Sequence, residues 1–282
     1  MSLPPFLVKK IPKQENINKI RALIGDPSLH TVCEEASCPN IGECYSQGTC
    51  TFIILGGVCS RSCAFCGVTR GTPLPPDPTE PGRIAEAVKK LGLNYVVITS
   101  VTRDDLPDGG AGHFAKVIDE LRISNIEYRI EVLIPDFKGE ISALKTVLDA
   151  KPNVLNHNIE TVPRLYSKVR PQASYERSLN TIKRAKAQGG RIYTKSGFMV
   201  GLGETKEEAV YVLYDLKKAD CDIVTIGQYL PPSRAHLKPP RFVDPAEFEE
   251  YQKLGEEMGL RVFAGPFVRS SYHAAKLEGI LN

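Results

Sequence analysis

Short apolar stretches alternate with amphipathic helical segments from residue 51 onward, and this alternation constrains the fold more than any other feature. Strands that alternate with helices predict parallel βαβ units with right-handed crossovers. About six such units predict an α/β fold, a partial (β/α)6 TIM-like barrel rather than a closed eightfold one. The expected strands are 52–55, 95–100, 127–134, 154–159, 191–200 and 223–229, with another candidate at 261–264, and the expected helices are 81–91, 111–122, 140–149, 175–187, 206–218 and 245–258.

The chain divides into a barrel with a segment on either side. Residues 1–50 form an N-terminal extension, with a short helical pattern around 16–24 and with Pro39 placed to begin a second short helix. The barrel is expected to span 51–265, and residues 266–282 form a C-terminal segment. With 282 residues, of which 42% are hydrophobic, one sizeable core is possible and the barrel need not be split into domains.

Three cysteines follow directly after the first expected strand. Cys59, Cys63 and Cys66 have the spacing C-x3-C-x2-C. Active sites of such barrels lie at the C-terminal ends of the strands, so chemistry is expected in this loop. Thiolates select soft iron–sulfur and zinc sites, and a cluster of four irons takes four ligands. Three thiolates leave one iron open to bind a small molecule, so the loop predicts a catalytic cluster.

Two other interpretations of this loop have less support. A structural zinc site would usually show a second C-x2-C or a pair of histidines at characteristic spacing, whereas the five histidines here are scattered and none adjoins the loop. A disulfide framework would need a secretory context.

A second cysteine triplet lies just upstream. Cys33, Cys38 and Cys44 have the spacing C-x4-C-x5-C. The alternative interpretation of these residues is half-buried structural thiols. The remaining two of the eight cysteines, Cys50 and Cys221, receive no role.

The loop spacing, with Phe65 just before the third cysteine, resembles the radical S-adenosylmethionine (SAM) enzymes. The two triplets together resemble one family, lipoyl synthase, over most of the chain from about His30 to Ala274. The departures are small: Thr102 stands where many members carry Asp, and Cys50 where Ala is usual. The resemblance is also carried by Cys-Glu-Glu-Ala-Ser-Cys-Pro-Asn at 33–40, Arg-Asp-Asp-Leu at 103–106, Asn-His-Asn-Ile-Glu at 156–160, Thr-Lys-Ser-Gly at 194–197, Met-Val-Gly-Leu-Gly-Glu-Thr at 199–205 and Arg-Ser-Ser-Tyr-His-Ala at 269–274.

This resemblance implies an activity and its cofactors. In radical SAM enzymes the open iron holds the amino and carboxylate groups of SAM, and an electron cleaves SAM to a 5′-deoxyadenosyl radical. Lipoyl synthases are transferases that insert two sulfur atoms into a protein-bound N6-octanoyl-lysine to give N6-lipoyl-lysine. The implied cofactors are two [4Fe–4S] clusters, with SAM as co-substrate.

The resemblance also implies the ligands of the second, auxiliary cluster, which donates the sulfur. They are Cys33, Cys38, Cys44 and an unusual serine near the C-terminus, which closes the cluster. Spacing alone does not choose between the two adjacent serines. We place the ligand at Ser271, with Ser270 as the alternative.

Polar residues of the fourth expected strand are candidates for binding SAM. Period-two alternation places Asn156, Asn158 and Glu160 on one face of that strand. Polar groups aimed into a barrel need partners, which the ribose and methionine groups of SAM would supply. A satisfied polar network or a helix-capping role is the alternative. Of these residues, Asn158 and Glu160 are the predicted SAM contacts.

Three further residues complete the predicted SAM contacts. Lys195 lies on the fifth expected strand beside Gly197, where the missing side chain leaves room for a ligand; a structural ion pair is the alternative. Arg103, just after the second strand, could pair with a carboxylate, but the two aspartates that follow it could equally bind it locally. Phe65 is included because of its place in the cysteine loop.

The glycine-containing stretch 201–204 is not a dinucleotide-binding fingerprint, because it lacks a third glycine at the right offset. We expect it to turn the chain into the helix at 206–218. Thr205 is the expected N-cap, and Glu208 three residues later completes a capping box.

Composition restricts the compartment and the partners. There is no apolar run of 18 residues or more, which predicts no membrane span. The start of the chain lacks a signal-peptide core, and eight cysteines without an export signal suggest a reducing, cytoplasmic location. A net charge of +3 is too small to indicate nucleic-acid binding.

The resemblance implies protein partners as well. The substrates would be octanoylated lipoyl-carrier domains, namely E2 subunits of 2-oxoacid dehydrogenases and the H protein of glycine cleavage. A ferredoxin- or flavodoxin-type reductant would supply electrons, and an iron–sulfur carrier would repair the auxiliary cluster.

Two other functions stay open. One is a different radical SAM enzyme, methylthiolating or dehydrogenating, that uses its auxiliary cluster for another purpose. The other is a ferredoxin-type electron-transfer protein, which would not need six βαβ units and whose clusters would normally have four thiolates each.

Overall fold

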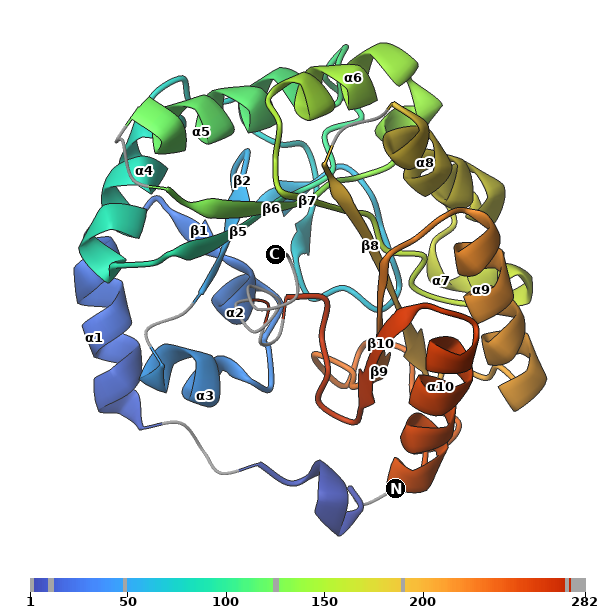
Figure 1. The fold of residues 1–282 in the computed structure, drawn as a ribbon. Coiled ribbons are helices and arrows are strands. Elements are labelled where there is room, and N and C mark those ends of the chain that lie inside the picture. The colour runs from blue at the N-terminus through green and yellow to red at the C-terminus, as the bar shows by residue number, and fades with distance from the viewer. Residues whose placement is uncertain are drawn as a thin grey trace. The chain divides into compact units, whose positions relative to one another are not determined.

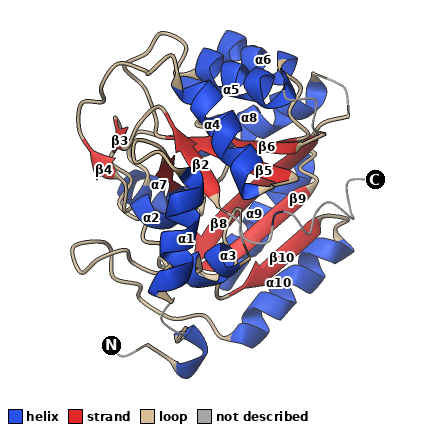
Figure 2. Ribbon diagram, turned by 90° about the vertical axis from the view of Figure 1, so that its left-hand side faces the viewer, coloured by secondary structure: helices blue, strands red, loops and turns tan. Residues whose placement is uncertain are grey.

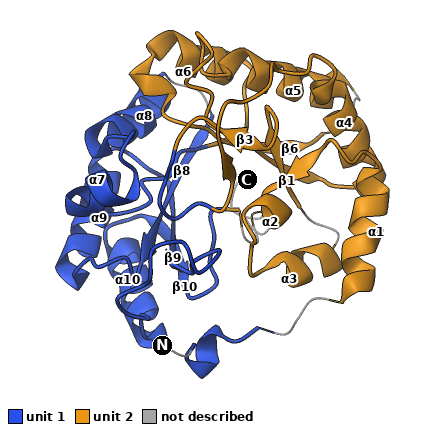
Figure 3. Ribbon diagram, turned by 180° about the vertical axis from the view of Figure 1, so that it is seen from behind, with its two compact units in different colours: residues 1–9, 62–66, 156–270 blue, residues 10–61, 67–155, 271–282 orange. Residues whose placement is uncertain are grey.

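The computed structural model describes residues 3–9, 13–47, 50–123, 127–188, 191–271 and 274. The chain forms two compact units, which Figure 3 shows in different colours. Unit 1 comprises residues 1–9, 62–66 and 156–270, and unit 2 comprises residues 10–61, 67–155 and 271–282. The chain passes from unit 2 to unit 1 within the cysteine loop, between Arg61 and Ser62.

Unit 2 contains a sheet with the strand order β1-β2-β5-β6-β7. β2, β5 and β6 are parallel, whereas the short β1 is antiparallel to β2. β2 and β5 are mostly apolar and almost completely buried, as expected for strands covered on both faces. Their bounds are β1 (His30–Thr31), β2 (Thr51–Ile54), β5 (Tyr95–Ser100), β6 (Arg129–Leu133) and β7 (Val154–Asn156).

Helices pack beside one another in this unit, α5 between α4 and α6 (Figure 1). α4 has Pro81 in its first turn and ends at Gly92 in the left-handed conformation, which are the usual signals of a helix start and stop. The helices are α1 (Gln14–Ile24), α2 (Val32–Glu35), α3 (Ile41–Ser46), α4 (Glu80–Leu91), α5 (Ala111–Ile123), η2 (Phe137–Gly139) and α6 (Ile141–Asp149), and a two-stranded parallel sheet is formed by β3 (Val58–Cys59) and β4 (Thr69–Arg70).

Unit 1 contains the parallel strands β8, β9 and β10 in that order, visible as three neighbouring arrows in Figure 2. Its core is one cluster of buried apolar side chains from these strands and from the helices that pack on them. The bounds are η1 (Pro5–Leu7), η3 (Pro163–Leu165), α7 (Tyr166–Val169), α8 (Tyr175–Ala187), β8 (Tyr193–Val200), α9 (Lys206–Lys218), β9 (Ile223–Gln228), α10 (Pro245–Glu257) and β10 (Arg261–Gly265).

Four expected strands, 52–55, 127–134, 154–159 and 223–229, end earlier than predicted. The first ends at Ile54 because Leu55 has a φ of 68°, and the strand expected at 154–159 ends at Asn156. Glu160 also has a φ of 68° and forms only an isolated parallel bridge with Phe198. A positive φ cannot continue a strand, so the loop that leads to Cys59 begins sooner than the apolar pattern suggests.

The short elements β1, β3, β4, α2 and α7 were not expected from the sequence. Within the described part of the chain, no helix combines the length and the apolar character needed to cross a bilayer.

Candidate active site

The first cysteine of the loop lies on β3 in unit 2. The sulfur of Cys59 accepts hydrogen bonds from the backbone N–H of Thr102, at 3.3 Å, and of Arg61, at 3.5 Å. Peptide N–H groups aimed at a sulfur stabilise its thiolate, which is the form that binds iron. The surroundings of Cys59 therefore fit a ligand of an iron–sulfur cluster.

The other two cysteines of the loop belong to unit 1. The backbone N–H of Cys66 donates to the carbonyl of Cys63 at 3.2 Å, so both lie in one tight turn. The Nε2 atom of His236 donates to the Cys66 carbonyl at 3.0 Å, and Nδ1 of that ring lies 2.9 Å from the hydroxyl of Ser233. Since a carbonyl only accepts, the Nε2 atom carries a proton. Phe65 packs, partly buried, against the apolar core of unit 1.

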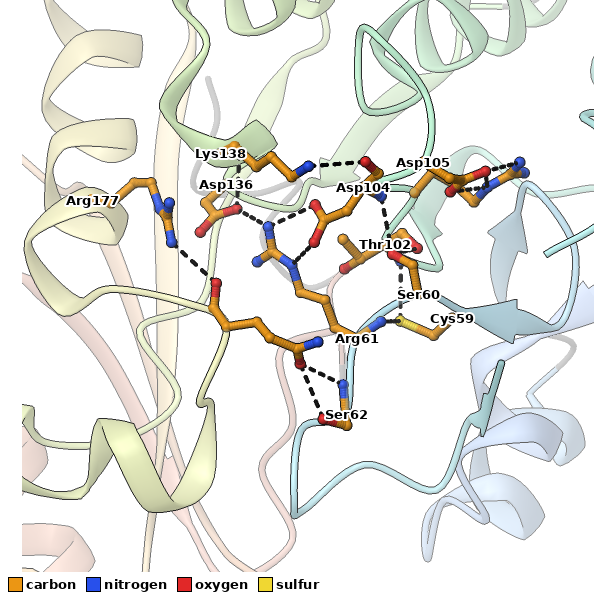
Figure 4. A network of polar contacts seen from close by, with 12 residues as sticks. Cys59, Ser60, Arg61, Ser62, Thr102, Asp104, Asp105, Asp136, Lys138 and Arg177 are labelled. Carbon is orange, nitrogen blue, oxygen red and sulfur yellow. Dashed lines mark hydrogen bonds and ion pairs between the residues drawn. The ribbon is translucent and has the colours of Figure 1, made fainter. Parts of the chain in front are cut away.

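A buried arginine inside the loop was not among the predicted site residues. Arg61 forms two hydrogen bonds to the carboxylate of Asp104, at 2.7 and 2.9 Å, and one of 2.6 Å to Asp136 (Figure 4). The sequence does place Arg61 between two cysteines, but its partners follow other strands. No local pattern links these residues, so the sequence alone did not indicate the contact.

The auxiliary triplet lies in unit 2. Cys33 is on α2 and Cys44 on α3, and the turn between these helices carries Cys38, whose N–H donates to the Cys33 carbonyl at 3.1 Å. Burial, with a smaller contribution from the charges of Cys38 and Cys44, raises the pKa of the Cys33 thiol to about 12. The three thiols thus lie close enough to influence one another electrostatically.

Cys50, which received no role from the sequence, is a fourth thiol beside this triplet. It is buried, and burial raises the pKa of its thiol well above the ordinary value, with Cys33 and Cys44 adding to the effect. The next residue, Thr51, donates its backbone N–H to the Cys33 sulfur. Cys221 lies in unit 1, where its buried sulfur is 3.3 Å from the Ile223 carbonyl.

The segment that carries the auxiliary triplet is in contact with the strand and loop that lead to Cys59. β1 pairs with β2, with His30 opposite Ile53. The imidazole of His30 also lies so close to Gly57 that a Cβ there would be 3.1 Å from the ring. Gly57 therefore permits the close approach of a residue three positions before Cys33 to the loop two positions before Cys59.

Three predicted polar residues come together in unit 1, joined by one of the two serines. Asn156 donates to the Ser270 hydroxyl at 2.8 Å, and this hydroxyl donates to Asn158 at 2.8 Å. Asn158 donates in turn to the Glu160 carboxylate at 3.1 Å. Burial raises the pKa of Glu160, while the charge of Arg170 lowers it. These contacts match the satisfied polar network that the sequence analysis gave as the alternative to SAM binding.

Ser271 has different surroundings from Ser270. It belongs to unit 2, is half-buried, and its carbonyl accepts from the N–H of Ala274 at 3.3 Å. Within the described part of the chain, no residue forms a hydrogen bond with the Ser271 hydroxyl. Residues 272, 273 and 275–282, which complete the predicted C-terminal segment, lie outside the described residues.

The last two predicted SAM contacts are both buried. Arg103 pairs with Asp105, with N···O distances between 2.7 and 3.1 Å. This is the local ion pair that the sequence analysis gave as the alternative to binding a ligand carboxylate. Lys195 lies on β8. A Cβ at the neighbouring Gly197 would collide with the Thr225 hydroxyl and lie 3.1 Å from Asn158. Protein atoms thus fill the space that the sequence suggested for a ligand.

A zinc site needs several side chains that bind one metal ion. Among the residues that the structure describes, no three His, Cys, Asp or Glu side chains are arranged to hold one metal ion. A four-iron cluster differs because each thiolate binds its own iron.

Comparisons with known proteins give the family. The model of the radical SAM superfamily matches residues 53–216, and that of the N-terminal domain of lipoyl synthase matches residues 1–38. Lipoyl synthase of Caldanaerobacter subterraneus is 54% identical over 262 residues, which are 92% of this chain and 92% of that protein. Lipoyl synthase of Rubrobacter xylanophilus is 55% identical and covers 96% of this chain and 85% of its own length. The chain belongs to the lipoyl synthase family.

Solved structures of lower identity resemble this lipoyl synthase family member in fold. The hydrogenase maturase HydG has a TM-score of 0.60 at 17% identity, over 74% of this chain and 49% of HydG. Methylornithine synthase has a TM-score of 0.54 at 16% identity, over 74% of this chain and 69% of that enzyme. Together with the family match, they confirm the predicted α/β partial barrel of radical SAM enzymes.

Membership of the lipoyl synthase family also confirms the predicted enzyme class, a radical SAM enzyme that inserts sulfur, and its cofactors. The individual ligands and the three-part domain division remain predictions. The residues present fit the clusters, because Cys59 receives two peptide N–H groups and the auxiliary thiols lie together.

Proposed function

We propose that this chain forms lipoyl groups by means of a SAM-binding cluster on Cys59, Cys63 and Cys66 and an auxiliary cluster on the upstream triplet. Its substrate is an octanoyl group attached to a lysine of a lipoyl-carrier domain. The observation that carries the proposal is the contact between the two cysteine segments, since β1 pairs with β2 and His30 lies against Gly57. Sulfur transfer needs both clusters near one alkyl chain.

When bound, the clusters supply the electron that cleaves SAM to the 5′-deoxyadenosyl radical and the sulfur atoms that enter the octanoyl chain. The chain's own residues hold and orient these groups. Three thiolates leave one iron without a protein ligand, so the amino and carboxylate groups of SAM can bind there. The N–H groups of Arg61 and Thr102 offset the negative charge of the Cys59 thiolate.

Side chains of unit 1 are proposed to bind the polar parts of SAM. Asn158 and Glu160 form a bonded pair just beyond the end of β7, and Lys195 is on β8. Phe65 adds an apolar surface within the cysteine loop. Arg103 contributes least, because Asp105 already neutralises its charge.

The fourth ligand of the auxiliary cluster is proposed to be a serine, Ser271 rather than Ser270. A serine that ligates iron gives up its proton. Ser270 uses its proton in a hydrogen bond to Asn158, whereas no described residue hydrogen-bonds the Ser271 hydroxyl. An alkoxide holds iron less tightly than a thiolate does, on soft–hard grounds, and a labile ligand suits a cluster that is taken apart in each reaction.

The reaction implies further partners. The substrates are octanoylated E2 subunits of 2-oxoacid dehydrogenases and the glycine cleavage H protein. A ferredoxin- or flavodoxin-type protein supplies single electrons, and an iron–sulfur carrier rebuilds the auxiliary cluster. The proposed compartment is the cytoplasm, where thiols stay reduced.

The test is anaerobic reconstitution with iron and sulfide, followed by SAM, a reductant and an octanoyl-lysine peptide. Mass spectrometry should show a peptide that has gained two sulfur atoms and lost two hydrogens, together with 5′-deoxyadenosine. The product should stop at about one lipoyl group per chain, because the auxiliary cluster is consumed. Deoxyadenosine without sulfur in the peptide would indicate a different radical SAM enzyme, and no SAM cleavage would indicate an electron-transfer protein.

A further inference from the structure

Arg61 is buried within the cysteine loop, with 4% of its surface exposed. Its Nε and one terminal nitrogen bond the two oxygens of Asp104, at 2.7 and 2.9 Å. The same terminal nitrogen bonds Asp136 at 2.6 Å, as Figure 4 shows. All of these residues belong to unit 2. A planar guanidinium in this arrangement has a fixed direction, unlike a mobile surface cation.

The two aspartates come from the loops after neighbouring parallel strands. Asp104 follows β5 and Asp136 follows β6, while Arg61 follows β2. The strand order β2-β5-β6 places these three loops at one edge of the sheet. A single side chain therefore joins the cysteine loop to the two adjacent strand ends.

Backbone and side-chain contacts strengthen the same connection. The Ser60 hydroxyl donates to the Thr102 carbonyl at 2.8 Å and accepts from the Asp104 N–H at 3.0 Å. Lys138 donates its side-chain amine to the Asp104 carbonyl at 2.9 Å and its N–H to Asp136 at 3.1 Å. The backbone of Asp104 and the carboxylate of Asp136 are thus held in place themselves.

We propose that Arg61 is a positioning residue for the SAM-binding cluster: through Asp104 and Asp136 it holds the loop so that the Cys59 sulfur keeps both of its peptide N–H donors. One of those donors is the N–H of Arg61 itself, and the other belongs to Thr102, next to the Ser60–Thr102 bond. The inference rests on the proposed function, because it takes Cys59 to be a cluster ligand.

The physical consequence is a change in the cluster's properties rather than only in stability. Hydrogen bonds to cluster sulfurs and the nearby charge set the reduction potential of an iron–sulfur cluster. A guanidinium is always protonated in proteins, and that of Arg61 is paired with the carboxylates of Asp104 and Asp136. The loop is therefore held by a permanent cation that is balanced by two carboxylates.

The test compares two arginines that each bond two aspartates. Arg61→Lys keeps the positive charge but loses the planar guanidinium that bonds both oxygens of Asp104. Arg83→Lys is the control. Arg83 lies on α4 and bonds Asp26 at 2.6 Å and Asp77 at 2.5 Å, and none of these three residues belongs to the cysteine loop. Each full-length variant is reconstituted anaerobically. The SAM-binding cluster is monitored by EPR, through the part of the signal that changes when SAM is added.

In Arg61→Lys we expect that cluster to lose iron to a chelator on the order of tenfold faster than in the wild type, because bonds to charged groups are lost. Its midpoint potential should become more negative, because a loosened loop weakens the N–H bonds to Cys59. Arg83→Lys should match the wild type in both measurements. Asp136→Asn should also lose iron faster than the wild type, which keeps the test decisive if Arg61→Lys fails to fold; its potential is left out of the comparison, because this substitution itself removes a negative charge.

Wild-type rates of iron loss in both Arg61→Lys and Asp136→Asn, with a wild-type potential in Arg61→Lys, would overturn the inference and leave the proposed function intact. Equal shifts in Arg83→Lys would also overturn it, because a general loss of stability would then be the cause. A wild-type protein without a SAM-responsive cluster would overturn the proposed function and the inference with it.

Discussion

Individual side chains give the cysteine thiols of this protein two different environments. Cys59 is half-buried, and its sulfur accepts two peptide N–H groups. Burial instead raises the pKa of Cys33 to about 12, so its charge is costly until a cation binds. In the proposed auxiliary cluster, positively charged irons would offset that cost.

The two serines near the C-terminus offer a test at the scale of single residues. We expect Ser271→Ala to assemble both clusters and to lower lipoyl formation strongly, because sulfur release depends on the loosely held iron. Ser270→Ala should have less effect, since it removes only the bonds to Asn156 and Asn158. Ser271→Cys should hold the iron more firmly and slow sulfur release. The measurement is single-turnover yield divided by bound iron.

If the serine pair only capped a helix, each alanine variant would lose about 0.5–2 kcal/mol of stability and keep its activity per folded molecule. A full yield from both alanine variants would remove serine from the ligands of the auxiliary cluster.

At the scale of elements, function depends on the loops that follow the strands. The cysteine loop follows β2, the loop with Asp104 follows β5, and the loop with Asp136 follows β6. Parallel strands bring these ends to one edge of the sheet, so residues far apart in sequence can bond there. The auxiliary triplet differs, because two short helices, α2 and α3, carry or flank its cysteines.

The two cysteine elements should be separable by substitution. Changing Cys33, Cys38 and Cys44 together to alanine should spare SAM cleavage and abolish sulfur insertion, because the radical forms but no sulfur is available. Production of 5′-deoxyadenosine and of lipoyl peptide from the same sample measures both steps. Lipoyl product from this variant would contradict the auxiliary cluster as sulfur donor.

At the scale of the whole molecule, the chain should carry two separate clusters. Two triplets predict about eight iron atoms per chain after anaerobic reconstitution. Changing Cys59, Cys63 and Cys66 to alanine should leave about four and abolish SAM cleavage. Iron and sulfide analysis, with EPR of the reduced protein, checks the count. SAM cleavage by this triple variant would show that the cysteine loop is not the SAM site.

Local patterns in the sequence determined most of the elements and the cysteine sets. The helices expected at 175–187 and 206–218 and the strand expected at 95–100 have those bounds in the structure. The predicted capping box of Thr205 and Glu208 is present with both reciprocal hydrogen bonds. Such features depend on residues within one helical turn or one strand period, so they can be predicted from the sequence alone.

Only the tertiary structure decided which distant side chains meet. Arg61 finds its partners 43 and 75 residues away, a separation that no periodic pattern encodes. β7 ends at Asn156, although the strand was expected to continue to residue 159, and Glu160 beyond it forms an isolated bridge with Phe198. Sequence patterns report local backbone preference, whereas pairing between loops depends on the packing of the strands that carry them.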